Sequence, residues 1–137
     1  GIIASMQPTH QTSDRLMAEA RLGPNRLAGA YAWESIRKTG AHLAFGSDAP
    51  VTPLAPWEGV RAAVHHHAPE SRVDPATAFA AHTAGGWAAA HRPGGTLTPR
   101  APAHLAVWDT AGFPDLTAPP PRCLRTVASG QTIWKVS

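Results

Sequence analysis

Apolar residues recur along the chain in two patterns, short uninterrupted runs and helix-like spacings. Residues 2–6 (IIASM) and 42–46 (HLAFG) are short apolar runs followed by turn-forming residues, which is typical of buried strands. Trp57, Val60 and Val64 recur at the spacing i, i+3, i+7, which predicts a helix with one apolar face. Short buried strands that alternate with helices favour an α/β fold built on a parallel sheet.

Capping residues predict the helix boundaries in the first third of the chain. Ser13 or Asp14 is expected to cap a helix that stops at Gly23 and Pro24. The stretch WESIRKTG predicts a helix over residues 33–39 that is closed by Gly40 at the C′ position. Residues 27–33 are ambiguous, and a short strand over AGAYAW (28–33) is our interpretation.

The later helices have equally plain signals. Pro56 suits the first turn of the helix that contains Trp57. Asp74 and Pro75 form a strong N-cap and N1 pair for the next helix. Gly85 and Gly86 are expected to divide that region into two helices, the second over residues 87–91.

The pattern changes after residue 92. Residues 95–109 and 126–137 are β-type runs, joined by a proline-rich link over residues 114–121, and SGQT (129–132) predicts a hairpin turn. We therefore expect an α/β part over residues 1–92 and a small β part over residues 93–137.

Composition narrows the class of protein. A chain of 137 residues is about one ordinary domain. Its formal charge of +3 is modest and its arginines are scattered, so nucleic acid is not an expected partner. The single Cys123 excludes an internal disulfide framework, which fits the cytoplasm. No apolar run reaches the roughly 18 residues that a membrane span needs. The chain opens on a strand pattern without an initiator methionine, so we expect it to be the tail of a longer polypeptide.

Two residues stand where parallel strands are expected to end. His10 follows the first run and Asp48 follows the second. Functional groups in parallel α/β folds gather at the carboxyl ends of strands, and an imidazole and a carboxylate there are plausible metal ligands. For Asp48 an ordinary turn or capping role is an equal alternative, because Asp before a proline turn is common.

Four stretches of the sequence make the interpretation of His10 and Asp48 as metal ligands more specific. In order they are ASMQPTH, LGPNRLAGAYAWESI, TGAHLAFGSDAPVTPLAPWEGVRAAV and HTAGGWAAAH. Together they cover most of residues 1–110 and resemble the carboxyl-terminal portion of the metal-dependent amidohydrolase superfamily. The resemblance is strongest to amidohydrolase family 3, the YtcJ-like branch grouped with N-substituted formamide deformylase. It implies the C-terminal part of a (β/α)8 TIM-type barrel, followed by strands of a small β-sandwich.

The resemblance also implies a chemistry. His10 matches the family's histidine after QP, which is expected to bind a divalent metal such as zinc. Asp48 matches the aspartate of GSD, which is expected to contact the metal or its water and to carry the proton to the leaving nitrogen. A zinc ion lowers the pKa of bound water to about 7, and a positioned carboxylate typically contributes a factor of about 10²–10⁴ in rate.

The chain departs from the family pattern in three places. Arg100 stands where the family has glycine, and His104 stands where it has aspartate, which bears on the turn geometry of the small β part. The family's His-x-His pair, its bridging ligand and its further histidine have no counterpart here. A complete barrel takes about 250 residues, so this chain alone is not expected to assemble the metal centre.

Other candidate residues have plainer interpretations. The run His65–His67 is interpreted as the polar end of a helix, with metal binding as the alternative, because successive helical residues point about 100° apart. His82 and His91 are expected at the surface or at helix ends, and the five tryptophans in the core or at interfaces. Arg26 and Tyr31 are candidate substrate-binding residues. Ser47 lacks the context of a nucleophilic serine.

Two classes of function remain from the sequence. The first is a hydrolase of non-peptide carbon–nitrogen bonds, acting on a small amide-type substrate, to which this chain contributes the carboxyl-terminal segment. The second is a non-catalytic remnant or interaction module derived from such an enzyme. A homo-oligomer is compatible with either class.

Overall fold

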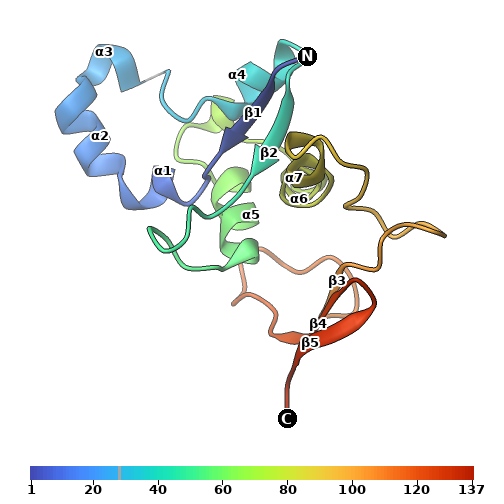
Figure 1. The fold of residues 1–137 in the computed structure, drawn as a ribbon. Helices are drawn as coiled ribbons and strands as arrows, with labels where there is room; N and C mark the ends of the chain where they lie inside the picture. The colour runs from blue at the N-terminus through green and yellow to red at the C-terminus, as the bar shows by residue number, and fades with distance from the viewer. Residues whose placement is uncertain (28) are drawn as a thin grey trace.

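The computed structural model describes residues 1–27 and 29–137, which form two small sheets and a series of short helices (Figure 1). The elements occur in this order: β1 (Ile3–Met6), α1 (His10–Ser13), α2 (Arg15–Leu22), α3 (Pro24–Leu27), α4 (Trp33–Lys38), β2 (His42–Phe45), α5 (Pro56–Val64), η1 (Pro69–Ser71), α6 (Pro75–His82), α7 (Ala84–Ala89), β3 (Leu105–Trp108), β4 (Cys123–Ala128) and β5 (Gln131–Lys135). The fold is mixed α/β, as predicted. The described residues form no closed barrel, since β1 and β2 are their only parallel pair and a barrel of this type closes eight.

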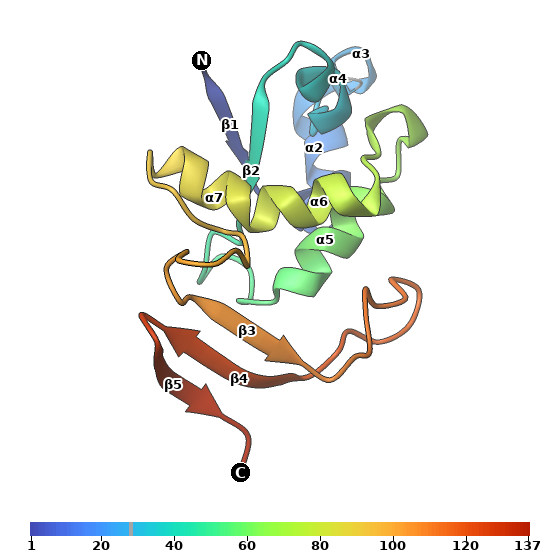
Figure 2. The same cartoon turned by 90° about the vertical axis from the view of Figure 1, so that its right-hand side faces the viewer.

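The parallel sheet consists of the two apolar runs that open the sequence pattern. Strands β1 and β2 pair in register, with Ile3 opposite His42 and Met6 opposite Phe45. Helices α6 and α7 contact β2 and run across one face of the sheet, and α5 packs against α6 (Figure 2). The core between these layers is formed by Trp33, Leu43, Phe45, Trp57, Val60, Ala63, Val73, Ala78 and Ala81.

The segment between the two strands is helical. The predicted helix is α2, and the chain leaves it at Gly23, whose φ of 72° suits a glycine. Residues 29–31 form a turn and residue 32 is irregular, so the strand predicted over residues 28–33 is wrong where it is described, and Ala28 lies outside the described residues. Trp33 instead opens α4, and Gly40 closes that helix with a φ of 86°, as predicted.

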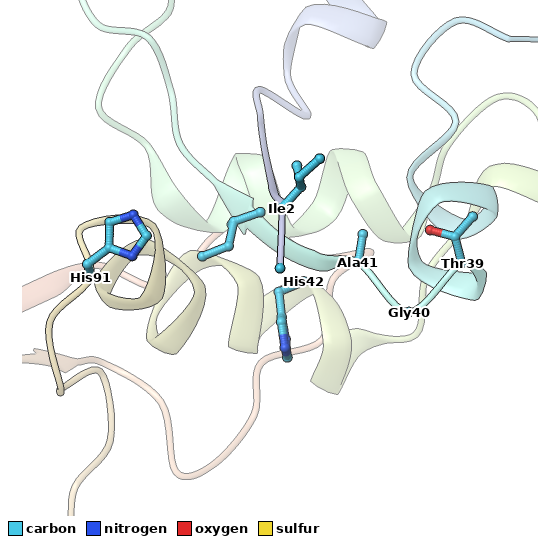
Figure 3. A pocket seen from close by; sticks show the side chains of 8 residues that line it. Ile2, Thr39, Gly40, Ala41, His42 and His91 are labelled. Atoms are coloured by element: carbon cyan, nitrogen blue, oxygen red, sulfur yellow. The ribbon is translucent and has the colours of Figure 1, made fainter.

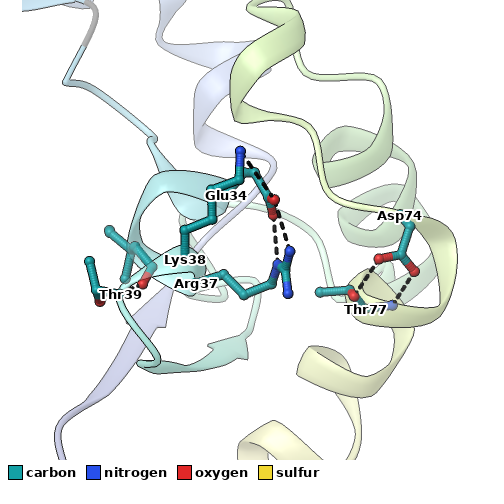
Figure 4. A network of polar contacts seen from close by, with 7 residues as sticks. Glu34, Arg37, Lys38, Thr39, Asp74 and Thr77 are labelled. Atoms are coloured by element: carbon teal, nitrogen blue, oxygen red, sulfur yellow. Dashed lines mark hydrogen bonds and ion pairs between the residues drawn. The ribbon is translucent and has the colours of Figure 1, made fainter.

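Side-chain caps and ion pairs fix several helix ends (Figure 4). The Asp74 carboxylate accepts a hydrogen bond of 2.9 Å from the Thr77 amide, which confirms the predicted N-cap of α6. Hydrogen bonds from the Thr77 hydroxyl and amide lower the pKa of Asp74. On α4 the Glu34 carboxylate accepts two hydrogen bonds from Arg37, which hold the pKa of Glu34 below its usual value. These contacts are exposed and stabilise single turns rather than the core.

The division between α6 and α7 differs from the sequence prediction. The chain bends at Thr83, with φ −114° and ψ −90°, and α7 already begins at Ala84. Gly85 and Gly86 therefore lie inside a helix. Gly85 is needed for close approach, because a side chain there would collide with the backbone of Leu43 on β2.

The carboxyl-terminal part forms an antiparallel sheet in the order β3-β4-β5, from the predicted β-type runs. Ser129 and Gly130 join β4 to β5 with φ of 50° and 79°, which confirms the predicted hairpin turn. Arg100 has a φ of 70°, a conformation that glycine adopts without cost. The departure from the family pattern thus falls on a position whose backbone favours glycine.

Candidate site at the carboxyl ends of the parallel strands

The residues that follow β1 and β2 leave the sheet at the same edge. The strands are parallel, and the Gly46 amide donates a hydrogen bond of 3.1 Å to the Met6 carbonyl just beyond the last paired residues. The two following segments also contact each other, since the Thr9 and Thr52 hydroxyl oxygens lie 3.2 Å apart. The carboxyl edge of the sheet is thus bordered by the segments that carry His10 and Asp48.

His10 is the first residue of α1 and is half-buried. Its Nε2 atom is buried and has no hydrogen-bond partner among the described residues. A buried ring nitrogen without a partner is costly, and Nε2 of a neutral imidazole is a common metal ligand. The ring therefore has a coordinating atom available that the rest of the described chain does not satisfy.

Asp48 is exposed and has a φ of 58°. This left-handed conformation is uncommon for residues other than glycine, although aspartate tolerates it better than most. The loop around it is held by main-chain bonds, because the Val51 amide donates to the Asp48 carbonyl at 2.8 Å and the Thr52 hydroxyl donates to the Ser47 carbonyl. The carboxylate is left without a protein partner among the described residues.

A pocket of about 250 Å³ opens at the same edge. Its lining includes Thr9 and Ser47, the residues directly before His10 and Asp48. Nine residues line it in all: Thr9, Phe45, Gly46, Ser47, Leu54, Ala55, Pro56, Gly59 and His82. The pocket therefore lies at the ends of both strands, and its lining includes the chain neighbours of His10 and Asp48 but neither of these two residues.

His82 is a pocket residue that the sequence analysis did not identify. It ends α6, as expected for a helix-end histidine, but its ring turns inward onto Phe45, with ring centroids 5.4 Å apart. Burial lowers the pKa of His82. One signal for the inward position of His82 was available. It lies eight residues after the Asp74 N-cap and one helical turn after Ala78, which is buried.

The histidine run has a different structure from the one predicted. His66 is completely buried and packs edge-to-face against Trp33, with ring centroids 5.1 Å apart. His67 Nδ1 lies 2.8 Å from the Oε1 atom of the buried Gln11, so this ring nitrogen donates to the amide oxygen. The interpretation as a polar helix end is therefore wrong for His66, because the chain turns inward after α5. Among residues 1–27 and 29–137, no three His, Cys, Asp or Glu side chains are grouped closely enough to hold a metal ion.

The buried His66 is expected to make the protein sensitive to acid. Burial, reinforced by His67, lowers the pKa of His66 from 6.5 to about 4, and the Ala68 amide donates to its Nδ1 atom at 2.9 Å. The unfolded chain takes up this proton near pH 6.5, whereas the folded protein does so only near pH 4. The free energy of unfolding is therefore expected to fall as the pH is lowered through this window.

Urea denaturation at about pH 7 and about pH 4.5 measures this effect. The variant His66→Phe is expected to lose part of the pH dependence, and the exposed His91→Phe is the matched control. An equal loss of stability on acidification in His66→Phe and the wild type would contradict the assignment.

The two predicted substrate-binding residues lie away from the pocket lining. Arg26 is exposed on α3, and Tyr31 has a φ of 56° and packs on Trp33 with ring centroids 5.9 Å apart. Burial raises the pKa of Tyr31. Neither residue lines the 250 Å³ pocket, and their contact with substrate stays a prediction.

A larger pocket, of about 540 Å³, lies at the opposite, amino-terminal end of the parallel strands. Figure 3 shows His42 and His91 beside it, together with Ile2 and the turn of Thr39, Gly40 and Ala41. Its position at the starts of β1 and β2 separates it from His10 and Asp48. Functional groups of parallel α/β folds gather at the carboxyl ends instead.

Comparison with known proteins identifies the family. The sequence profile of the amidohydrolase family, of the family 3 type, matches residues 1–134. This chain belongs to the amidohydrolase family.

A curated relative is "Putative amidohydrolase YtcJ" of Bacillus subtilis (strain 168), which is 38% identical over 63 residues. The matched stretch is 46% of this chain and 12% of that protein, so the similarity covers a small part of the relative's length. No solved structure matches the chain significantly. No helix among the described residues is long and apolar enough to cross a membrane.

Proposed function

We propose that this chain contributes His10 and Asp48 to the active site of a metal-dependent hydrolase of non-peptide carbon–nitrogen bonds. The observation that carries the proposal is the membership of residues 1–134 in the amidohydrolase family. The parallel register adds support, because it brings the segments that carry both residues to one edge of the sheet. The substrate is a small amide-type molecule, and a cytoplasmic location is expected.

The two residues fit part of a metal site. His10 offers a buried Nε2 atom without a partner, and Asp48 offers an exposed carboxylate. Imidazole nitrogen and carboxylate oxygen are both ordinary ligands of zinc. The described residues supply no third ligand to this group, so the remaining ligands are proposed to come from sequence outside these 137 residues.

A divalent metal held here, zinc in this proposal, would supply an activated water at neutral pH. With that metal bound, the Asp48 carboxylate would accept a proton from the attacking water and donate it to the leaving nitrogen. The His10 ring is held by the start of α1, where the amide of His10 donates to the Gln7 carbonyl at 3.1 Å. This bond fixes the backbone that carries the ring.

A non-catalytic remnant or interaction module is the second candidate. It is favoured by one observation, the lack of a group of three metal-ligating side chains among residues 1–27 and 29–137. An upstream reading frame that encodes a His-x-His pair would support the enzyme, and its absence would support the remnant.

The metal content of a His10→Asn variant of the natural full-length protein tests the proposal. We expect the purified variant to lose most of its zinc, because a nitrogen ligand is removed from a site with few ligands. The exposed His91→Asn is the matched control and is expected to keep the wild-type content. Plasma emission spectrometry measures both, and undiminished zinc in His10→Asn would refute His10 as a ligand.

A further inference from the structure

The pocket at the carboxyl edge of the sheet has a mostly apolar lining. Phe45, Leu54 and Pro56 contribute apolar surface, and no Asp, Glu, Lys or Arg is among the nine lining residues. The polar side chains are the hydroxyls of Thr9 and Ser47 and the ring of His82. Apolar pockets with a few placed polar groups bind small molecules, and those polar groups decide orientation and specificity.

The His82 ring is fixed in one orientation. Its Nδ1 atom lies 2.9 Å from the Ala78 carbonyl, and since a carbonyl oxygen only accepts, Nδ1 donates the proton. The ring also packs edge-to-face on Phe45, with an interplanar angle of 70°. Gly59 of α5 makes room for it, because a side chain at that position would collide with His82 Nε2.

These contacts leave Nε2 as a hydrogen-bond acceptor. A neutral imidazole that carries its proton on Nδ1 has a lone pair on Nε2. Burial lowers the pKa of His82, which keeps the ring neutral at neutral pH. The Nε2 atom lies against Gly59, and both His82 and Gly59 line the pocket.

We propose that this pocket binds an uncharged, apolar group that carries an N–H or O–H donor, and that His82 Nε2 accepts the hydrogen bond from that group. This inference rests on the proposed function, since it makes the pocket a substrate subsite beside His10 and Asp48. The expected substrates are amides with a compact apolar substituent that bears a hydrogen-bond donor, in preference to charged amides.

The test uses aniline and N,N-dimethylaniline as probes of the natural full-length protein. Both are uncharged and aromatic at neutral pH, and only aniline has N–H donors. We expect aniline to bind about three- to tenfold more tightly, which corresponds to one net hydrogen bond. The variant His82→Phe is expected to lose this preference while it still binds N,N-dimethylaniline, and the exposed His91→Phe is expected to keep the preference.

Nitrogen-15 NMR of the wild-type His82 ring provides a second measurement that needs no variant. Aniline is expected to shift the Nε2 resonance and to leave Nδ1 protonated, and N,N-dimethylaniline is expected to leave Nε2 unchanged. Equal affinities, no binding of aniline, or the same preference in His82→Phe would overturn the proposal. Neither probe is hydrolysed, so this failure is separate from any failure of the proposed hydrolase activity.

Discussion

Replacement of Asp48 by Asn in the natural full-length protein is expected to reduce turnover by about 10²–10⁴-fold, the usual contribution of a general acid–base group. The amide keeps an oxygen that can contact the metal, so the zinc content is expected to fall little. The same substitution removes the group that is proposed to accept and donate the proton. The positive φ of Asp48 is also retained, since asparagine tolerates this conformation as well as aspartate does.

A matched control for this variant is Asp109→Asn. Asp109 is exposed, and its carboxylate forms an ion pair of 3.4 Å with Arg122 beyond the end of β3. The control is expected to keep wild-type kcat and zinc content. Steady-state kinetics together with metal analysis distinguish the outcomes, and wild-type turnover in Asp48→Asn would remove Asp48 from the mechanism.

Replacement of Trp33 by Ala is expected to lower the free energy of unfolding by about 3–5 kcal/mol. Trp33 is completely buried, and its ring packs against Phe45 at 5.8 Å and His66 at 5.1 Å between centroids. Its loss leaves a cavity between α4, β2 and the segment after α5. That cavity lies behind β2, the strand that leads to Asp48.

The exposed Ser35→Ala on the same helix is the control for Trp33→Ala, with an expected change within about 0.5 kcal/mol. Urea denaturation measures both variants. A change below about 1 kcal/mol in Trp33→Ala would show that this residue does not hold the core together.

The local signals of the sequence predicted most elements correctly. The apolar runs that became β1 and β2, the period of α5 and the Asp74 cap each depend on neighbouring residues alone. The strand expected around residues 29–32 was wrong, since a short run of small and aromatic residues lacks a decisive period. The glycines at 85 and 86 were misjudged because tertiary contact with β2 overrides the low helix propensity of glycine.

The site was predictable only in part. The places of His10 and Asp48 after two strands follow from the apolar pattern, and their proposed roles come from the resemblance to the family. His66 and His82 were not identified as buried or pocket residues, because their environments depend on contacts with α4 and β2, far away in sequence. No local pattern distinguishes a histidine that turns inward at a helix end from one that turns outward.

The most direct measurement is a crystal structure of the natural full-length protein with anomalous diffraction data collected at the zinc edge. We expect a metal peak within about 2.0–2.2 Å of both His10 Nε2 and an Asp48 carboxylate oxygen. A metal peak bound elsewhere, or one beyond bonding distance of either side chain, would contradict the shared site at the carboxyl edge of β1 and β2.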